Sequence, residues 1–169
     1  MSTDHTTHDD SRAAYPGSSR VRDFTDRAEI RVVANLVGVG FLVFGLLGFV
    51  PGITTHYADL GLGGKSSTAM LFGIFRVSIL LNVVYLIFGV AGILQARSAV
   101  TARNYLVTGG AVFGVLWLYG LVIDQNGASN LLAVNRVDNW WHLLLCLGLI
   151  ATGVVMGRHT SSRSEDMTD

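Results

Sequence analysis

Four apolar stretches, each about as long as a lipid bilayer is thick, constrain this chain more than any other feature. They cover residues 32–50, 69–94, 105–123 and 140–157. A helix needs about 20 mostly apolar residues to cross the roughly 30 Å of hydrocarbon in a membrane. A soluble core does not need four such runs in only 169 residues. The sequence therefore predicts an all-α integral membrane protein, folded as an antiparallel bundle of four transmembrane helices.

The segments that flank these stretches are polar. Residues 1–25 are rich in Ser, Thr, Asp, Arg and His and show no apolar periodicity, so we expect a disordered tail there. Residues 158–169 have the same polar character, and we expect a second disordered tail. The predicted folded part is one transmembrane domain over residues 26–157, because the chain is too short for two.

Positive charge is unevenly distributed among the connecting segments. Nine of the 12 basic residues lie in the two tails and in the loop between the second and third stretches, whereas Lys65 and Arg136 lie on the opposite side. Segments rich in Lys and Arg remain in the cytoplasm. We therefore predict a multi-pass protein of the cell membrane with both termini cytoplasmic. The formal net charge of zero provides no basic field, so we expect no nucleic-acid partner.

Small residues form stripes within the apolar stretches. The glycines of these stripes are Gly38, Gly45, Gly89, Gly92, Gly110, Gly114, Gly153 and Gly157. Helices in lipid associate by close packing and by interhelical hydrogen bonds, and small residues permit the close approach. We expect these glycines to pack helices together within one molecule. The alternative is an interface in a homo-oligomer or in a larger membrane complex.

The two halves of the chain share a faint repeat. Residues 44–45 and 113–114 both read Phe-Gly, and both follow an asparagine at the same distance. In the second and fourth stretches, Asn82 and His142 each follow an Arg-Val pair at the same distance. This pattern fits two hairpins of the same orientation. Chance similarity in glycine-rich apolar sequence is the alternative.

Polar residues gather near the predicted outer ends of the second, third and fourth stretches. They are Arg76, Asp124, Asn135, Asp138, Asn139 and His142. An arginine inside a span is costly and usually faces a partner or a cavity. Our hypothesis is that Arg76 pairs with Asp124 or Asp138 in one outer polar patch. The alternative is an arginine that extends to the outer interface on its own.

Three further polar residues, Ser78, Asn82 and Tyr85, extend inward from this patch along one face of the second stretch. We expect interhelical hydrogen bonds from this face. His142 lies four residues before Cys146, the single cysteine, on one helical face. Two such residues are too few for a specific metal site. The sequence therefore predicts no metal site and identifies no cofactor.

The order of these residues resembles that of a known family. The likeness lies in residues 69–92, in Ala-Arg-Asn-Tyr at 102–105 and in Val-Asn-Arg-Val-Asp-Asn-Trp-Trp-His at 134–142. These segments are similar to the bacterial membrane family catalogued as domain of unknown function 4383. The resemblance extends over roughly residues 31–157. It implies a four-span membrane protein without an established activity, and the run from Asn135 to His142 is its best-matching functional candidate.

No nucleophile–base pair, phosphate-binding loop or pair of membrane carboxylates points to a catalytic residue or to an enzyme. The sequence favours a non-enzymatic accessory or assembly component of the cell envelope, surrounded by membrane lipid. One alternative is a redox-linked protein or one that binds a small ligand, such as a quinone or a lipid head group. Another is an oligomeric transporter or channel, which needs a polar path through the membrane.

Overall fold

Four helices, a small three-stranded sheet and two short 3₁₀ helices make up the part of the chain that the computed structural model describes, residues 16–161. Side chains are described for residues 27–157. Residues 1–15 and 162–169, which include most of both predicted tails, lie outside the described residues.

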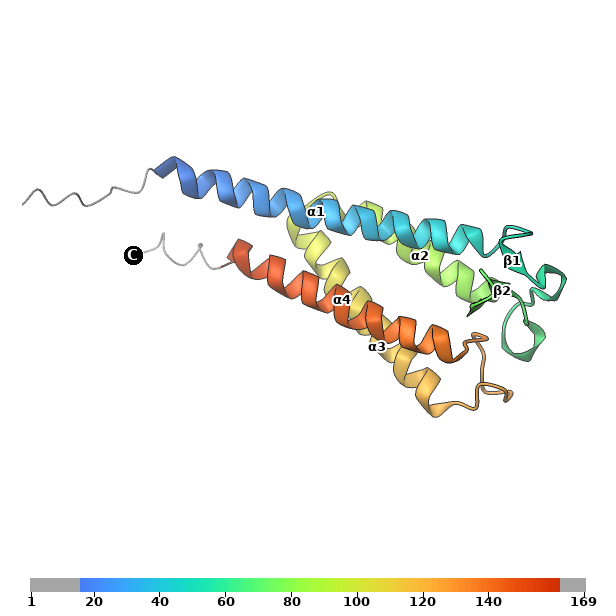
Figure 1. The fold of residues 1–169 in the computed structure, drawn as a ribbon. Helices are drawn as coiled ribbons and strands as arrows, with labels where there is room; N and C mark the ends of the chain where they lie inside the picture. The colour runs from blue at the N-terminus through green and yellow to red at the C-terminus, as the bar shows by residue number, and fades with distance from the viewer. Residues whose placement is uncertain (1–15, 162–169) are drawn as a thin grey trace, which may run out of the picture.

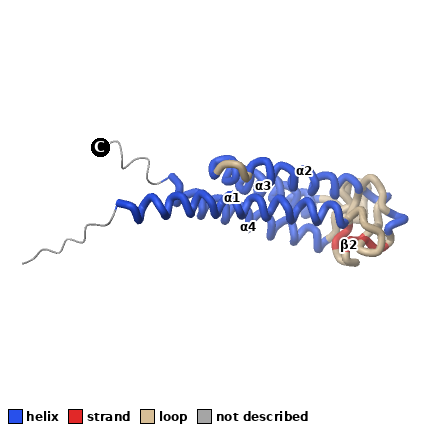
Figure 2. The backbone as a smooth tube through the Cα atoms, turned by 90° about the horizontal axis from the view of Figure 1, so that it is seen from above, coloured by secondary structure: helices blue, strands red, loops and turns tan. Residues whose placement is uncertain are grey.

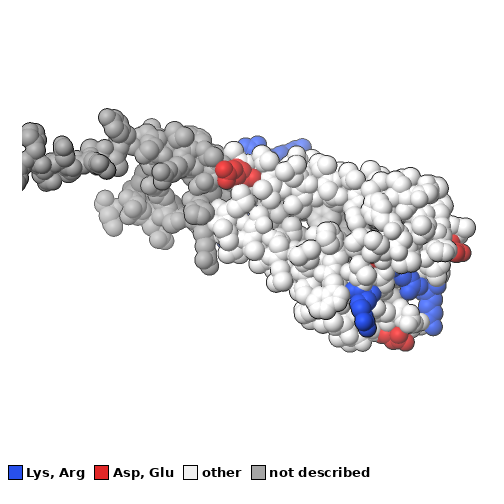
Figure 3. Space-filling view, in the orientation of Figure 1, with Lys and Arg blue, Asp and Glu red and all other residues white. Residues whose placement is uncertain are grey.

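The helices lie side by side, roughly along one axis (Figures 1 and 2). They are α1 (Pro16–Leu47), α2 (Ile79–Gln95), α3 (Ala99–Val122) and α4 (Arg136–Ser161). The most extensive contacts join α1 to α2 and α3 to α4, so the bundle consists of two helical hairpins. By length and composition α1, α3 and α4 are able to cross a membrane, and α2 is a shorter apolar helix. On the face shown in Figure 3, charged residues gather toward the two ends.

The segment between α1 and α2 forms most of a cap at one end of the bundle (Figure 1). Its strands are β1 (Thr54–Thr55), β2 (Met70–Leu71) and β3 (Phe75–Arg76), and its 3₁₀ helices are η1 (Tyr57–Asp59) and η2 (Gly64–Ser66). The strands are antiparallel in the order β1-β2-β3, with Thr54 opposite Leu71 and Met70 opposite Arg76. Leu71 and Val77 are fully buried in a second, small apolar core at this sheet.

The prediction of a continuous helical span over residues 69–94 is wrong in its first part. Phe72 and Gly73 have φ angles of 54° and 70°, and this left-handed backbone closes the β2–β3 hairpin. The helix begins after Ser78, whose Oγ accepts a hydrogen bond from the N–H of Leu81 at 3.1 Å. Hydropathy alone did not reveal this boundary, because a short apolar run suits a buried strand as well as a helix.

Arg76 is therefore not inside a helical span. It lies on β3, in the cap, and its side chain is half-buried. Ser78 likewise lies at the start of α2 and not within a longer span.

The other three helices begin earlier than the apolar stretches, α4 at Arg136. Helix α1 begins at Pro16, because proline suits the first turn and no glycine or proline interrupts the chain between Gly17 and Gly38. Residues 16–25 of the predicted tail are thus helical. Helix α3 begins at Ala99, because Ser98 accepts a hydrogen bond from the N–H of Thr101 at 3.2 Å.

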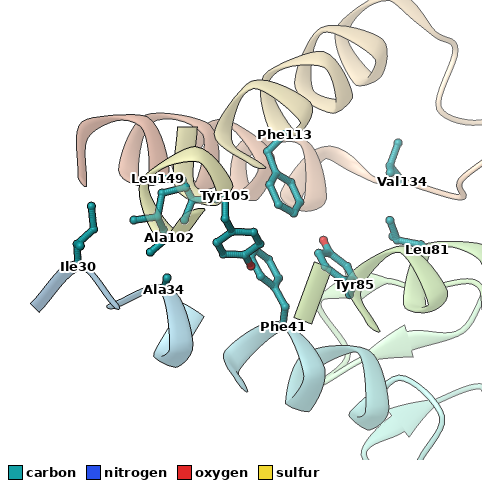
Figure 4. Packing of buried hydrophobic residues seen from close by; sticks show 11 residues of the cluster. Ile30, Ala34, Phe41, Leu81, Tyr85, Ala102, Tyr105, Phe113, Val134 and Leu149 are labelled. Atoms are coloured by element: carbon teal, nitrogen blue, oxygen red, sulfur yellow. The ribbon is translucent and has the colours of Figure 1, made fainter. Parts of the chain in front are cut away.

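Aromatic rings from three helices meet at the centre of the bundle (Figure 4). Phe41 of α1 stacks on Phe113 of α3 with ring centroids 5.1 Å apart, and on Tyr85 of α2 at 5.9 Å. Phe44 meets Tyr85 edge-on at 5.0 Å. Ring pairs at these separations are favourable beyond the area that they bury. These contacts therefore join the two hairpins to each other.

The eight glycines of the stripes lie where helices within one molecule approach each other. A Cβ atom on Gly38 of α1 would lie 2.8 Å from the backbone nitrogen of Ile93 on α2. In the second hairpin, a Cβ on Gly110 would lie 3.0 Å from the carbonyl oxygen of Cys146. Both distances are too short for a side chain, so these glycines permit close packing of the backbones.

The faint sequence repeat has a counterpart in this packing. A Cβ on Gly45 would contact the side chain of Leu86 at 3.0 Å, and a Cβ on Gly114 would contact Cys146 at 3.0 Å. The two partners are equivalent, because each lies one helical turn after the polar residue of its half of the repeat. The two hairpins therefore use equivalent positions for equivalent contacts.

The glycine contacts make a direct prediction for stability. Gly38→Ala should lower the free energy of unfolding by about 1–3 kcal/mol, because the added methyl group forces α1 and α2 apart. Gly40→Ala is the matched control, since nothing lies within 4 Å of a Cβ at that position. The measurement is thermal unfolding of both variants in detergent. Equal losses in the two variants would contradict the role of Gly38 in packing.

Candidate functional site

Two clusters of polar side chains lie near each other, one where the cap meets the bundle and one deeper among the helices. The first, which we call the outer clamp, consists of Arg76, Asn135 and Asp138 and joins β3 to the start of α4. The second, which we call the inner cluster, consists of Asn82, Tyr85, Asn139 and His142, all of them buried. Asp124, the remaining member of the predicted outer patch, belongs to neither cluster.

The carboxylate of Asp138 is the centre of the outer clamp. Only 1% of this residue is exposed, and its Oδ2 accepts hydrogen bonds from the backbone N–H of Asn135 at 2.7 Å and of Arg76 at 3.2 Å. In return, Oδ1 of Asn135 accepts from the backbone N–H of Asp138 at 2.9 Å. The amide of Asn135 also donates to the carbonyl of Ile74 at 2.9 Å. These bonds fasten the β-sheet to the N-terminus of α4, where a negative charge is favourable.

Arg76 meets Asp138 through its main chain. Its guanidinium Nε donates instead to the carbonyl oxygen of Ser67 at 2.8 Å, within the cap. The other hypothesised partner, Asp124, is exposed in the turn after α3, where its Oδ1 accepts from the backbone N–H of Asn126 at 3.0 Å. The structure thus brings Arg76 and Asp138 together, but by a backbone N–H and not by an intramembrane ion pair.

Asn130 shapes the loop between α3 and α4, and the sequence analysis missed it. Its Oδ1 accepts from the N–H of Val134 at 2.9 Å, and its amide donates to the carbonyls of Gln125 and Val134 at 2.7 and 2.8 Å. The hydroxyl of Ser78 links α2 to the same loop by donating to the carbonyl of Leu132 at 2.9 Å. The only signal in the sequence was the abundance of asparagine in this loop.

A tyrosine and a histidine form the centre of the inner cluster. The hydroxyl of Tyr85 on α2 lies 3.1 Å from Nε2 of His142 on α4. Both residues are fully buried, with 1% and 0% of their surfaces exposed. Phe113 packs beside His142 with ring centroids 5.7 Å apart. The pair therefore lies in an apolar, ring-lined interior, where a hydrogen bond between helices is strong.

Three side chains of the inner cluster have hydrogen-bonding capacity that the described residues do not use. The atoms are Nδ2 and Oδ1 of Asn82, Oδ1 of Asn139 and Nδ1 of His142. Asn82 packs against Gly48, and Asn139 packs against Gly120. A buried polar atom without a partner is costly. These atoms therefore carry a local cost to stability, in a place where Gly48 and Gly120 pack closely against the two asparagines.

An apolar groove lies beside the ring cluster, between α1 and α4. It has a volume of about 240 Å³ and is lined by Val37, Gly40, Phe41, Phe44, Trp141, Leu145 and Leu149. The rings of Phe41 and Phe44 also contact Tyr85, so the groove lies one ring away from the Tyr85–His142 pair. Within the described residues, no group of three His, Cys, Asp or Glu side chains is placed to hold a metal ion.

Comparison with known proteins identifies one family. Its model matches residues 31–155, and its description is Domain of unknown function (DUF4383). No curated protein and no solved structure matches the chain.

The outer clamp predicts unequal roles for the two aspartates. Asp138→Ala should lower the free energy of unfolding by about 2–4 kcal/mol, because two backbone N–H groups lose their acceptor in a buried place. Asp138→Asn should lower the free energy of unfolding by less, since one acceptor oxygen remains. Asp124→Ala is the matched control, and it should lower the free energy of unfolding by less than about 1 kcal/mol, because Asp124 is exposed. Denaturant unfolding in micelles measures all three, and equal losses for the two alanine variants would refute the clamp.

Proposed function

The chain belongs to the DUF4383 family, and we propose that it is an integral protein of the cell membrane that crosses the bilayer four times. The length and apolar character of α1, α3 and α4 support three of the crossings. Helix α2 supports the fourth, because its 17 residues span about 25 Å at a rise of about 1.5 Å per residue. That length is close to the hydrocarbon thickness of a membrane.

The orientation follows from the charges at the two ends of the bundle. Arg31, Arg97 and Arg103 lie at the end opposite the cap, near the short connection between α2 and α3. Counted over the sequence, nine basic residues lie in the two terminal segments and around the α2–α3 connection, against three at the cap end: Lys65, Arg76 and Arg136. The positive-inside rule therefore favours a cap outside the cell and both termini in the cytoplasm.

Cysteine labelling tests this topology, with Cys146→Ala as the background because Cys146 is the single cysteine. Leu62→Cys in the cap and Val100→Cys at the start of α3 both lie at positions that are 70% exposed. A membrane-impermeant maleimide added to intact cells should label the cysteine at 62 and leave the cysteine at 100 unlabelled until the cells are permeabilised. Equal labelling of both in intact cells would mean that α2 does not cross the membrane.

Within the membrane, we propose a non-enzymatic accessory or assembly component of the cell envelope. The observation that carries this proposal is that the polar side chains make structural contacts. Asp138 and Asn135 join the sheet to α4, and Asn130 shapes the outer loop. Two residues that looked functional in the sequence, Asn135 and Asp138, thus hold the cap on the bundle. The cap in turn presents apolar residues outward, including Leu62 at 70% and Phe72 at 53% exposure. Such a surface suits contact with another membrane protein.

A second candidate function is the binding of a small apolar ligand in the groove between α1 and α4. The groove has an entirely apolar lining and lies beside the Tyr85–His142 pair. The apolar tail of a quinone suits this groove, because Phe41, Phe44 and Trp141 line it with apolar surface. A transporter has less support, since Asn82 and Tyr85 are enclosed by packed helices.

Native mass spectrometry of the chain extracted gently from its own membrane distinguishes these functions. The accessory role predicts a second protein or a further copy in the complex, and no stoichiometric small molecule other than lipid. Phe72→Ser should weaken that complex at least about fivefold, because an apolar contact is lost.

The ligand-binding role predicts a different result in the same experiment. A bound organic ligand that disappears in His142→Gln and in Gly40→Leu, which narrows the groove, would overturn the accessory role. Gly148→Leu is the matched control, because Gly148 is also open to its surroundings but does not line the groove.

A further inference from the structure

A second groove lies between α1 and the C-terminal end of α2, away from both polar clusters. It has a volume of about 510 Å³. Its lining includes Arg31, Val32, Asn35 and Leu36 of α1, and Ile93 and Arg97 from α2 and the residues that follow it. The close contact between Gly38 and Ile93 lies just beyond its inner end.

Two arginines, Arg31 and Arg97, line this groove at its end away from the cap. Nε of Arg31 donates to the carbonyl oxygen of Ala96 at 3.0 Å, which holds the Arg31 side chain across the end of α2, next to Arg97. A guanidinium has five N–H donors, more than this bond uses. None of the residues that line the groove is acidic. This end therefore favours an anion with several acceptor oxygens, and a phosphate is such an anion.

The rest of the groove is apolar. Val32, Leu36 and Ile93 have 56%, 63% and 38% of their surfaces exposed, so they present carbon atoms along its floor. Asn35 lies one helical turn after Arg31 on the same face of α1, beside Leu36. The groove thus combines two arginines at one end with an amide and hydrocarbon along its length. A glycerophospholipid offers complementary groups, because it carries a phosphate, ester groups and acyl chains.

We propose that this groove binds one anionic glycerophospholipid of the cytoplasmic leaflet, with its phosphate on Arg31 and Arg97 and an acyl chain along Val32, Leu36 and Ile93. The inference rests on the proposed membrane orientation, which places this end of the bundle at the cytoplasmic surface. Anionic lipids are preferred because a zwitterionic head group brings another cation to two arginines that have no acidic neighbour in the groove.

The test is native mass spectrometry of the purified full chain, titrated with dioleoylphosphatidylglycerol or with dioleoylphosphatidylcholine. One phosphatidylglycerol should be retained, with a preference of at least about fivefold over phosphatidylcholine. Arg31→Gln and Arg97→Gln should each lower that retention about fivefold. Arg103→Gln is the matched control, because it removes the same charge on α3, where Arg103 packs against Gly157 outside the groove.

A steric variant separates a formed site from general attraction between charges. Val32→Trp fills the apolar floor without a change of charge and should also lower phosphatidylglycerol retention about fivefold. Arg31→Lys keeps the charge and should give an intermediate loss, which provides a test if Arg31→Gln disturbs the end of α2. Equal retention of the two lipids, equal effects of the three arginine-to-glutamine variants, or full retention in Val32→Trp would overturn the proposal.

Membrane insertion is measured separately, by extraction of membranes with alkaline carbonate. Release of the chain would contradict the proposed function itself. Retention of the chain in the membrane without selective phosphatidylglycerol binding would overturn only the lipid site.

Discussion

In the membrane that we propose for this chain, helices gain little from burying apolar side chains against one another, and this constraint underlies the whole bundle. The chain meets it with backbone contacts at glycines and with a cluster of aromatic rings. Gly38 and Gly92 bring α1 and α2 together, and Gly110 brings α3 to α4. The rings of Phe41 and Phe113 then join the two hairpins. The equivalent contacts of Gly45 and Gly114 indicate that both hairpins follow one packing plan.

The cap depends on a different kind of interaction. Its strands are only two residues long, so backbone pairing within the sheet contributes little. The carboxylate of Asp138 adds bonds to two backbone N–H groups in a place where water is excluded. A buried acceptor of this kind is worth more than a surface ion pair, because its partners would otherwise remain unsatisfied. The cap therefore stays in a defined position on the bundle.

The two ends and the middle of the molecule offer three different environments. The cap presents apolar side chains on an ordered scaffold, and the groove between α1 and α4 is apolar throughout. The groove at the opposite end combines arginines with hydrocarbon. Each environment suits a different partner: a protein, an apolar ligand or a lipid. This distribution explains why polar residues in the sequence did not by themselves identify one functional centre.

Hydropathy and glycine spacing in the sequence were enough to predict a mostly helical protein with long apolar helices, whereas the family was identified from the order of residues in a few segments. These properties are local, because they depend on the residues within one segment. Hydropathy did not show where α2 begins. Phe72 and Gly73 form a turn that depends on the pairing of β2 with β3. The placement of Arg76 in the cap is a consequence of that turn.

The tertiary structure also decided which polar residues act together. Arg76 contacts Asp138, which is 62 residues away, and it does so through a backbone N–H that no side-chain pattern reveals. The partnership of Tyr85 with His142 likewise depends on how the two hairpins pack together, because the two residues lie on α2 and α4, which belong to different hairpins. The sequence by itself determined which segments are apolar enough to enter a membrane. Only the fold decided which side chains meet, because such contacts depend on the relative positions of helices that are distant along the chain.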